Sequence, residues 1–312
     1  MAFDLNTINA AAAADPAGFI AECDAAYSAR IARAAERIME NLPSSPIVLL
    51  SGPSGSGKTT TAMRIRDELT RRGVNCRSVA MDNYFHTVSP ETTPRTETGE
   101  YDFESPLCLD MALLNEHFTR LSRGESVAVP RFDFTSRSRA EEPSMSLSLG
   151  KNEVAIFEGI HALNSAITAV HPEAFKLYVS AQSGFVDGAG EHVFRASWLR
   201  MVRRVVRDDL FRASDPAETL GMWDNVRAGE RRYITPYRAQ ADMQIDTAFA
   251  YEPCVMRPIA AKLFSHVPEG IGRYEEICAV APALERFAVI DAALLAPDAM
   301  LREFVGGSRY RY

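Results

Sequence analysis

Hydrophobic side chains recur in a helical rhythm near the start of the chain. Residues 17–42 predict an amphipathic helix, because apolar positions follow one another at spacings of three and four: Ile20, Cys23, Tyr27, Ile31, Ala34 and Ile38. Pro43 and Pro46 close this helix, since proline cannot continue a helical hydrogen-bond ladder. The sequence therefore predicts a helical segment over residues 1–45 that is separate from the rest of the chain.

The next part of the chain predicts a strand, a glycine-rich loop, a helix and a second strand. Residues 47–50 form a short apolar run, residues 59–72 have a helical pattern that Gly73 ends, and residues 74–81 are a second apolar run. Such a βαβ unit implies a parallel sheet with helices on both faces. The predicted fold class is therefore α/β.

Further apolar runs extend the predicted sheet. Buried strands are expected at 154–157 and 175–179, with a weaker candidate at 241–245, and helices at 107–123, 195–212, 254–265 and 274–290. Residues 83–105 are polar and rich in Pro, Thr and Glu, which predicts a loop over the sheet edge. The pattern predicts a core over 46–250 and a C-terminal helical extension over 251–312.

Composition narrows the class of function. With 46% hydrophobic and 24% charged residues, the 312-residue chain has ordinary globular composition. Its net charge of −7 argues against a nucleic-acid partner, and no stretch of about 20 apolar residues predicts a membrane span. Single cysteines without metal-ligand spacing favour a reduced, cytoplasmic protein: Cys23, Cys76, Cys108, Cys254 and Cys278. A small-molecule partner is expected, and a homo-oligomer stays open.

The loop GPSGSGKT matches the complete P-loop pattern and lies between a predicted strand and a predicted helix. Backbone N–H groups of such a loop surround phosphate oxygens, so ATP or GTP is the expected cofactor. Lys58 is expected to reach the β and γ phosphates, and Thr59 to offer its hydroxyl to Mg²⁺. The predicted nucleotide-binding residues are Gly52, Ser54, Gly55, Ser56, Gly57, Lys58, Thr59 and Thr60.

Two acidic residues follow predicted strands. Asp82 comes after the strand at 74–81, and Glu158 after the strand at 154–157. Ligands of open parallel sheets lie at the carboxyl ends of strands, which predicts both acids at the P-loop edge. Glu158 is placed to hold Mg²⁺, and Asp82 to deprotonate the attacking hydroxyl. The non-catalytic alternative for either residue is a helix cap or a solvated acid in a loop.

Arginines gather on one predicted helix at 195–212. Arg200, Arg203, Arg204 and Arg207 share a helical face, which predicts a lid that closes over the phosphates, with Arg204 and Arg207 stabilising the transferred charge. The alternative is a solvated basic face paired with neighbouring acids. His86 either lines the acceptor site or lies exposed in a loop.

Seven stretches within 46–250 carry a family resemblance: GPSGSGKTT, MDNYF, YDFESPLCLD, VPRFDF, FEGIHALN, RRVVRDDLFR and ADMQI. In them the chain resembles the uridine kinase and phosphoribulokinase family of P-loop kinases. It is similar in particular to the kinase part of bacterial proteins that join such a domain to an N-terminal region related to threonyl-tRNA synthetase, and its ending LREFVGGSRY resembles theirs. In place of that N-terminal region the chain has about one predicted helix.

The resemblance implies roles for individual residues. Asp82 is similar to the family's catalytic base and Glu158 to its metal-linked acid, while Tyr84 and Glu104 resemble acceptor-site positions. The chain departs from the family at three positions. Phe132 and Arg137 stand where uridine kinases usually have Tyr and His that help to read the base, and Trp198 stands where they have Asp.

The sequence predicts a Mg²⁺-dependent kinase that transfers the γ-phosphoryl group of ATP or GTP to a small-molecule hydroxyl, as uridine and cytidine kinases do. A non-nucleoside acceptor, such as a sugar, polyol or anionic alcohol, is the alternative within this class. A nucleotide-binding regulatory module with little turnover is the alternative from another class. A base at position 82 favours the enzyme, because a nucleotide sensor needs no residue that deprotonates an acceptor.

Overall fold

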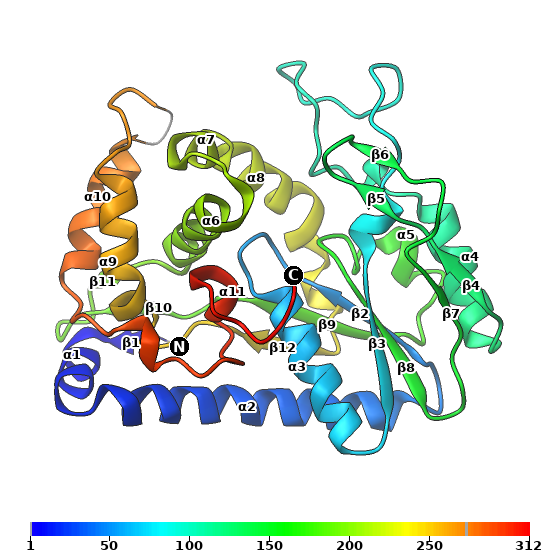
Figure 1. Cartoon of the computed structure of the whole chain (residues 1–312), viewed down its shortest axis with the longest axis horizontal. Helices are drawn as coiled ribbons and strands as arrows, with labels where there is room; N and C mark the ends of the chain where they lie inside the picture. Colours follow the sequence, from blue (N-terminus) through cyan, green and yellow to red (C-terminus); the bar gives the residue numbers. More distant parts are fainter. Residues whose placement is uncertain (1, 272–273) are drawn as a thin grey trace.

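The computed structural model describes residues 2–271 and 274–312 and has a central sheet of five strands (Figure 1). Every neighbouring pair in this sheet is parallel, which confirms the predicted α/β fold. The strands lie in the order β12 (Met243–Asp246), β9 (Phe175–Ser180), β2 (Ile47–Ser51), β8 (Glu153–Glu158) and β3 (Asn75–Ala80).

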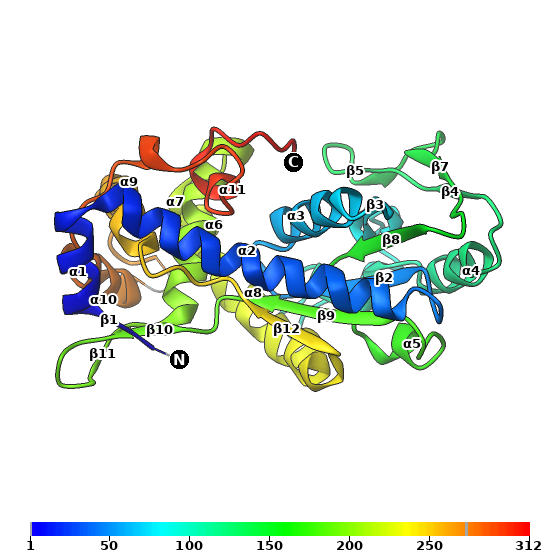
Figure 2. The same cartoon turned by 90° about the horizontal axis from the view of Figure 1, so that it is seen from below.

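Successive side chains of the central strands enter two different hydrophobic cores. In β2, Val48 and Leu50 join the core that contains helices α2 (Pro16–Asn41) and α3 (Lys58–Arg71). Ile47 and Leu49 join the core under α4 (Met111–Ser122) and α5 (Ser165–Thr168). Because strand side chains alternate between faces, the apolar runs are buried on both sides, as helices on both faces require (Figure 2).

Helix α2 begins where its sequence predicts. Pro16 occupies the first turn, and the Asp15 carboxylate accepts a hydrogen bond from the Gly18 N–H at 2.9 Å. Its buried stripe includes Tyr27, Ile31 and Ile38, which pack in the α3 core. The other predicted helices are confirmed as α4 and as α6 (Ala196–Arg212), α9 (Glu252–Phe264) and α10 (Tyr274–Glu285).

Several short elements carry no strong periodicity and were not predicted. They are β1 (Ala2–Asp4), α1 (Leu5–Ala14), β10 (Gly184–Val186), β11 (His192–Phe194), α7 (Pro216–Gly221), α8 (Trp223–Gly229), α11 (Arg302–Val305) and two ribbons, β4–β7 (Val127–Val129 with Met145–Leu147) and β5–β6 (Phe132–Asp133 with Ser138–Arg139). In Figure 1, β5 and β6 lie above the carboxyl end of β3.

The two ends of the chain pack with the middle. Strand β1 pairs in parallel with β10, and β10 pairs with β11, so the N-terminus completes a second, three-stranded sheet. One hydrophobic core holds Leu5, Val48 and Phe304 together with their neighbours. The three segments that the sequence predicts, with boundaries near residues 45 and 250, therefore share one hydrophobic core. Within the described residues, no helix is long and apolar enough to cross a membrane.

Candidate active site

The glycine-rich loop joins β2 to α3 at the carboxyl end of the sheet. Gly55 and Gly57 have φ angles of 72° and 79°, in the left-handed region that glycine adopts without strain. Gly57 is the N-cap residue of α3 and has no side chain to cap the helix, so the loop presents backbone N–H groups. The Lys58 ammonium lies against the loop and donates to the Pro53 carbonyl at 3.3 Å. This arrangement is suited to binding phosphate.

Strand register brings the two predicted acids to the same edge. Glu158 ends β8, where it lies opposite Leu50 of β2 and Ala80 of β3, and Asp82 follows two residues after Ala80. The Thr59 hydroxyl donates to Glu158 Oε1 at 3.1 Å. Adjacent oxygen ligands of octahedral Mg²⁺ are about 2.9 Å apart at its usual metal–oxygen distance of ~2.05 Å. The spacing of these two oxygens therefore fits a shared Mg²⁺ ion.

Burial shifts the pKa of the two strand-end acids and of the P-loop lysine. Burial raises the pKa of Glu158 to about 7, although the nearby Lys58 charge opposes this rise. Burial also raises the pKa of Asp82, with Lys58 and then Arg212 opposing, and it lowers the pKa of Lys58 itself. Such shifts are common where carboxylates perform chemistry, because a raised pKa makes a stronger base.

Helix α6 differs from the predicted lid in one respect. Arg203 is fully buried, donates to the Glu252 carboxylate at 2.6 Å and reaches the Gly55 carbonyl at 3.1 Å. Arg200 is also buried and donates to Glu230 at 2.7 Å and to the Ser54 carbonyl at 3.2 Å. Arg200 and Arg203 thus share the face of α6 that meets the loop, but they support the P-loop backbone from within the protein and do not form the expected lid.

The rest of the basic face lies beside the loop. Arg204 donates to Ser54 Oγ at 2.9 Å, and the buried Asp208 carboxylate is shared by three arginines, with Arg204 at 3.4 Å, Arg207 at 2.7 Å and Arg212 at 3.5 Å. One carboxylate cannot satisfy the donors of three guanidinium groups, so donors remain for a ligand next to the P-loop. Arg204 and Arg207 therefore stay in place as candidates to stabilise a transferred phosphoryl group.

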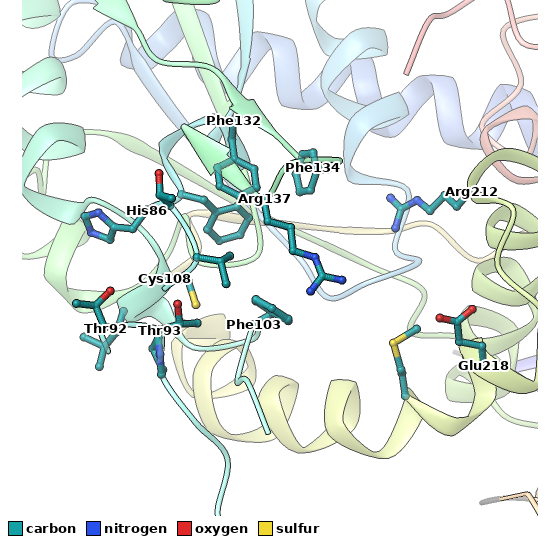
Figure 3. Close-up of a pocket in the computed structure, with 16 residues that line it drawn as sticks. His86, Thr92, Thr93, Phe103, Cys108, Phe132, Phe134, Arg137, Arg212 and Glu218 are labelled. Carbon is teal, nitrogen blue, oxygen red and sulfur yellow. The ribbon is translucent and has the colours of Figure 1, made fainter. Parts of the chain in front are cut away.

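A cavity of about 880 Å³ opens on the β5–β6 side of this edge. Figure 3 shows Phe132 and Phe134 on its wall, with Arg137 and Arg212 pointing into it from opposite sides. Arg137 has a φ of 53° and its guanidinium lies 5.9 Å from the centre of the Phe103 ring. A non-glycine residue in this region is strained by about 1–3 kcal/mol, and such strain is concentrated at ligand sites. His86 also lines this cavity.

The predicted acceptor residues do not all meet in this cavity. Phe132 and Arg137 line it, whereas Glu104 lines a second cavity of about 500 Å³ that also contacts Arg204. Burial raises the pKa of Glu104 to about 7, against the charges of Arg204 and Lys58. The assignment of Tyr84 to the acceptor site is wrong, because its ring is fully buried under the sheet and its hydroxyl contacts His117 Nδ1 at 2.9 Å.

Residues distant in sequence complete the nucleotide edge. Thr247 donates to the Ser56 carbonyl at 2.7 Å, and Glu252 holds Arg203 beneath the loop. The Glu303 carboxylate accepts hydrogen bonds from the N–H and the hydroxyl of Thr60. Glu303 lies in the ending LREFVGGSRY, but that stretch does not show what its side chain contacts, and no motif marks Thr247 or Glu252. Thr247 and Glu303 bond to the loop and to α3 across 191 and 243 residues. Trp198, the third departure from the family pattern, packs on the Phe194 ring and donates a hydrogen bond to Glu276.

A parallel sheet with a glycine-rich loop, a lysine and two acids at its carboxyl edge defines the class of P-loop kinases. Residues 47–250 match the model of the Phosphoribulokinase / Uridine kinase family. The chain belongs to this family, and it is a nucleotide-using phosphotransferase that acts on a hydroxyl group of a small molecule.

Two curated relatives and one solved structure illustrate the similarity. The uridine kinase of Staphylococcus haemolyticus is 30% identical over 200 residues, which cover 64% of this chain and 86% of that protein. The uridine kinase of Deinococcus deserti is 27% identical over 210 residues, which cover 67% of this chain and 91% of that protein. The structure of D-glycerate 3-kinase from Cryptococcus neoformans has a TM-score of 0.43 at 13% identity, covering 66% of this chain and 89% of that one.

Proposed function

We propose that this chain transfers the γ-phosphoryl group of ATP or GTP to a small-molecule hydroxyl bound in the phenylalanine-lined cavity. One observation carries the proposal: Arg212 lines that cavity, and its charge acts on Asp82, where it opposes the rise in pKa that burial causes. The candidate base is thus within electrostatic range both of the P-loop lysine and of a residue that lines the cavity. Five free cysteines support a reducing compartment such as the cytoplasm, and the ending LREFVGGSRY supports kinship with the fused bacterial kinases.

In this proposal each residue near the loop has a defined task. Asp82 accepts the proton of the acceptor hydroxyl, and its burial keeps it basic enough to do so. Lys58, Arg204 and Arg207 stabilise negative charge that spreads over the transferred group. Thr59 and Glu158 hold Mg²⁺, which when bound neutralises charge on the nucleotide phosphates. The cavity walls exclude water, which would otherwise compete with the acceptor.

The lining of the cavity indicates an acceptor with an apolar or flat body and a negative group. Phe85, Phe132 and Phe134 form a cluster with ring centres 5.1–6.4 Å apart. Arg137 and Arg212 add permanent positive charge. Phe132 cannot donate a hydrogen bond to a base carbonyl, and a site that lacks such a partner selects uridine poorly. Uridine and cytidine are therefore expected to be poor acceptors.

The test is a coupled ADP-release assay with nucleosides, sugars, polyols and anionic alcohols as acceptors. For uridine we expect kcat/KM below about 10⁴ M⁻¹s⁻¹, the lower end of the ordinary enzyme range. The double variant Phe132→Tyr with Arg137→His restores the residues that resemble those of uridine kinases, so its kcat/KM for uridine should rise. An ordinary uridine value in the unaltered protein contradicts the proposed acceptor class and leaves a plain uridine kinase.

A nucleotide-binding regulatory module with little turnover is the second candidate. The observation that favours it is Glu303, which contacts the first turn of α3 where a nucleotide phosphate is expected. The same assay separates the two functions, because a regulatory module would bind nucleotide without releasing ADP for any acceptor.

A further inference from the structure

The C-terminal segment, residues 298–312, lies along α3 beside the P-loop (Figure 1). Two anchors fix it to the outer surface of that helix. Asp298 pairs with Arg64 at 3.1 Å, and Asp67 accepts hydrogen bonds from Arg309 at 2.6 Å and from the Tyr310 hydroxyl at 2.8 Å. The segment is therefore a defined part of the fold at this edge of the sheet.

Between and just after these anchors, the segment contacts the expected nucleotide site itself. Glu303 Oε2 accepts from the Thr60 N–H at 3.1 Å and from the Thr60 hydroxyl at 2.6 Å, and the Tyr312 hydroxyl lies 3.0 Å from the Thr60 hydroxyl. Thr60 is fully buried, and only 9% of the Glu303 surface is exposed. A β-carbon placed on Gly57 would lie 2.6 Å from the Met300 sulfur, so the segment also covers the last glycine of the loop.

The position of Glu303 is one that suits a phosphate. The Thr60 N–H is in the first turn of the helix that follows the glycine-rich loop, where free donors and the helix dipole favour an anion. The Glu303 carboxylate also lies within electrostatic range of the Lys58 and Arg203 charges. A carboxylate that shares a donor and cations with the expected phosphate site competes with a phosphate for them.

We propose that Glu303 is a built-in competitor of the nucleotide, so that ATP binds only when the C-terminal segment moves off Thr60. The proposal rests on the nucleotide site of the proposed function. In the closed state Glu303 satisfies the Thr60 N–H, and its negative charge repels the nucleotide phosphates. The apparent affinity for ATP then falls by the fraction of molecules that are open, which makes the segment an autoinhibitory latch.

The proposal is tested by titrating ATP with Mg²⁺ and no acceptor into the full chain and its Glu303→Gln variant. Hydrogen bonds to a charged group exceed neutral ones by about 1–1.5 kcal/mol, so loss of the charge should loosen the latch and tighten ATP binding about tenfold. Asp298→Asn is the matched control. It removes the same charge from the same segment at Arg64 instead of Thr60, and we expect ATP affinity within about twofold of the unaltered chain.

Hydrogen exchange of residues 300–312 in the unaltered chain gives a second readout that needs no variant. ATP should accelerate exchange there, because the segment leaves α3. Slower exchange with ATP, or equal or weaker ATP binding by Glu303→Gln, overturns the latch and makes the segment a wall of the nucleotide site. Failure of the unaltered chain and of Glu303→Gln alike to bind either ATP or GTP overturns the proposed nucleotide site, and the latch with it.

Discussion

Two clusters of buried charge contact the P-loop, a lower one around Arg203 and an upper one around Lys58, and they differ in how fully their hydrogen bonds are made. Beneath the loop, Arg203 donates to both oxygens of Glu252 and to two backbone carbonyls. Above it, Lys58 faces Asp82 and Glu158, and burial shifts the pKa of each away from its usual value. The first cluster makes the hydrogen bonds that a buried ion pair requires, whereas the charges of the second are incompletely paired and can interact with a ligand.

The difference separates residues that hold the site from residues that perform chemistry. Paired charges that fill each other's hydrogen bonds contribute to the folded structure, while incompletely paired charges destabilise it and are kept where ligands supply the missing partners. Substitutions can probe each cluster separately. Changes beneath the loop should alter stability, and changes above it should alter turnover.

The largest effect is expected for Lys58→Ala, which removes the ammonium from the site where negative charge accumulates. Turnover should be abolished in a steady-state ADP-release assay. The fold should remain, because among the described residues the Lys58 ammonium makes a single hydrogen bond, to the Pro53 carbonyl. Circular dichroism checks this point. Normal activity of the variant contradicts the P-loop assignment.

Arg203→Ala should have the largest effect on stability. Removing one partner of a buried ion pair costs about 3–5 kcal/mol, because Glu252 would keep an uncompensated charge. Urea unfolding measures the loss as a lower midpoint at a similar slope. The double variant Arg203→Met with Glu252→Leu removes both charges and should recover most of the loss. A stable Arg203→Ala protein would mean that the lower cluster is not structural.

Asp82→Asn should lower the rate while nucleotide affinity stays near normal. The loss of a general base reduces turnover by roughly 10²-fold or more. Calorimetric titration of the nucleotide, beside the rate measurement, separates the two effects. If affinity falls as far as the rate does, Asp82 acts on the metal or the structure and not on the acceptor.

The smallest effect is a gain in stability for Glu158→Gln at alkaline pH. The pKa of Glu158 is about 7 in the folded state against 4.5 for the unperturbed group, so the folded state binds the proton more tightly. Stability of the unaltered chain therefore falls as pH rises from about 4.5 to 7. At pH 8 we expect the free energy of unfolding of the variant to be about 2 kcal/mol larger than that of the unaltered chain. This gain is below the limit of ~3 kcal/mol that a pKa shift of this size sets. At pH 4 the two proteins should be equally stable.

Thermal unfolding of both proteins across this pH range measures the difference. A constant difference at all pH values would show that Glu158 does not titrate in this window. The same substitution should weaken Mg²⁺ binding, because a neutral amide replaces a charged ligand.

The sequence predicted the parts of this molecule that local pattern determines. The P-loop and the strand-end acids were found because they belong to short segments whose order along the chain places them at one edge of the sheet. The second sheet was missed, because β1 and β10 have three residues each and are far apart in the sequence. The Arg203–Glu252 pair was missed because helical periodicity cannot tell a buried arginine from an exposed one. Tyr84 was misplaced because a motif position does not show which way a ring points.

The distant supports of the P-loop also set an order of events during synthesis. Thr60 and Glu303 are 243 residues apart, which at about 5–20 residues per second means that the loop leaves the ribosome ~12–50 s before its last contact exists. Thr247 and Glu252 arrive only slightly earlier than Glu303. The glycine-rich loop is therefore among the first parts of the site to be synthesised, and it lacks these distant contacts for most of the time that the chain is growing.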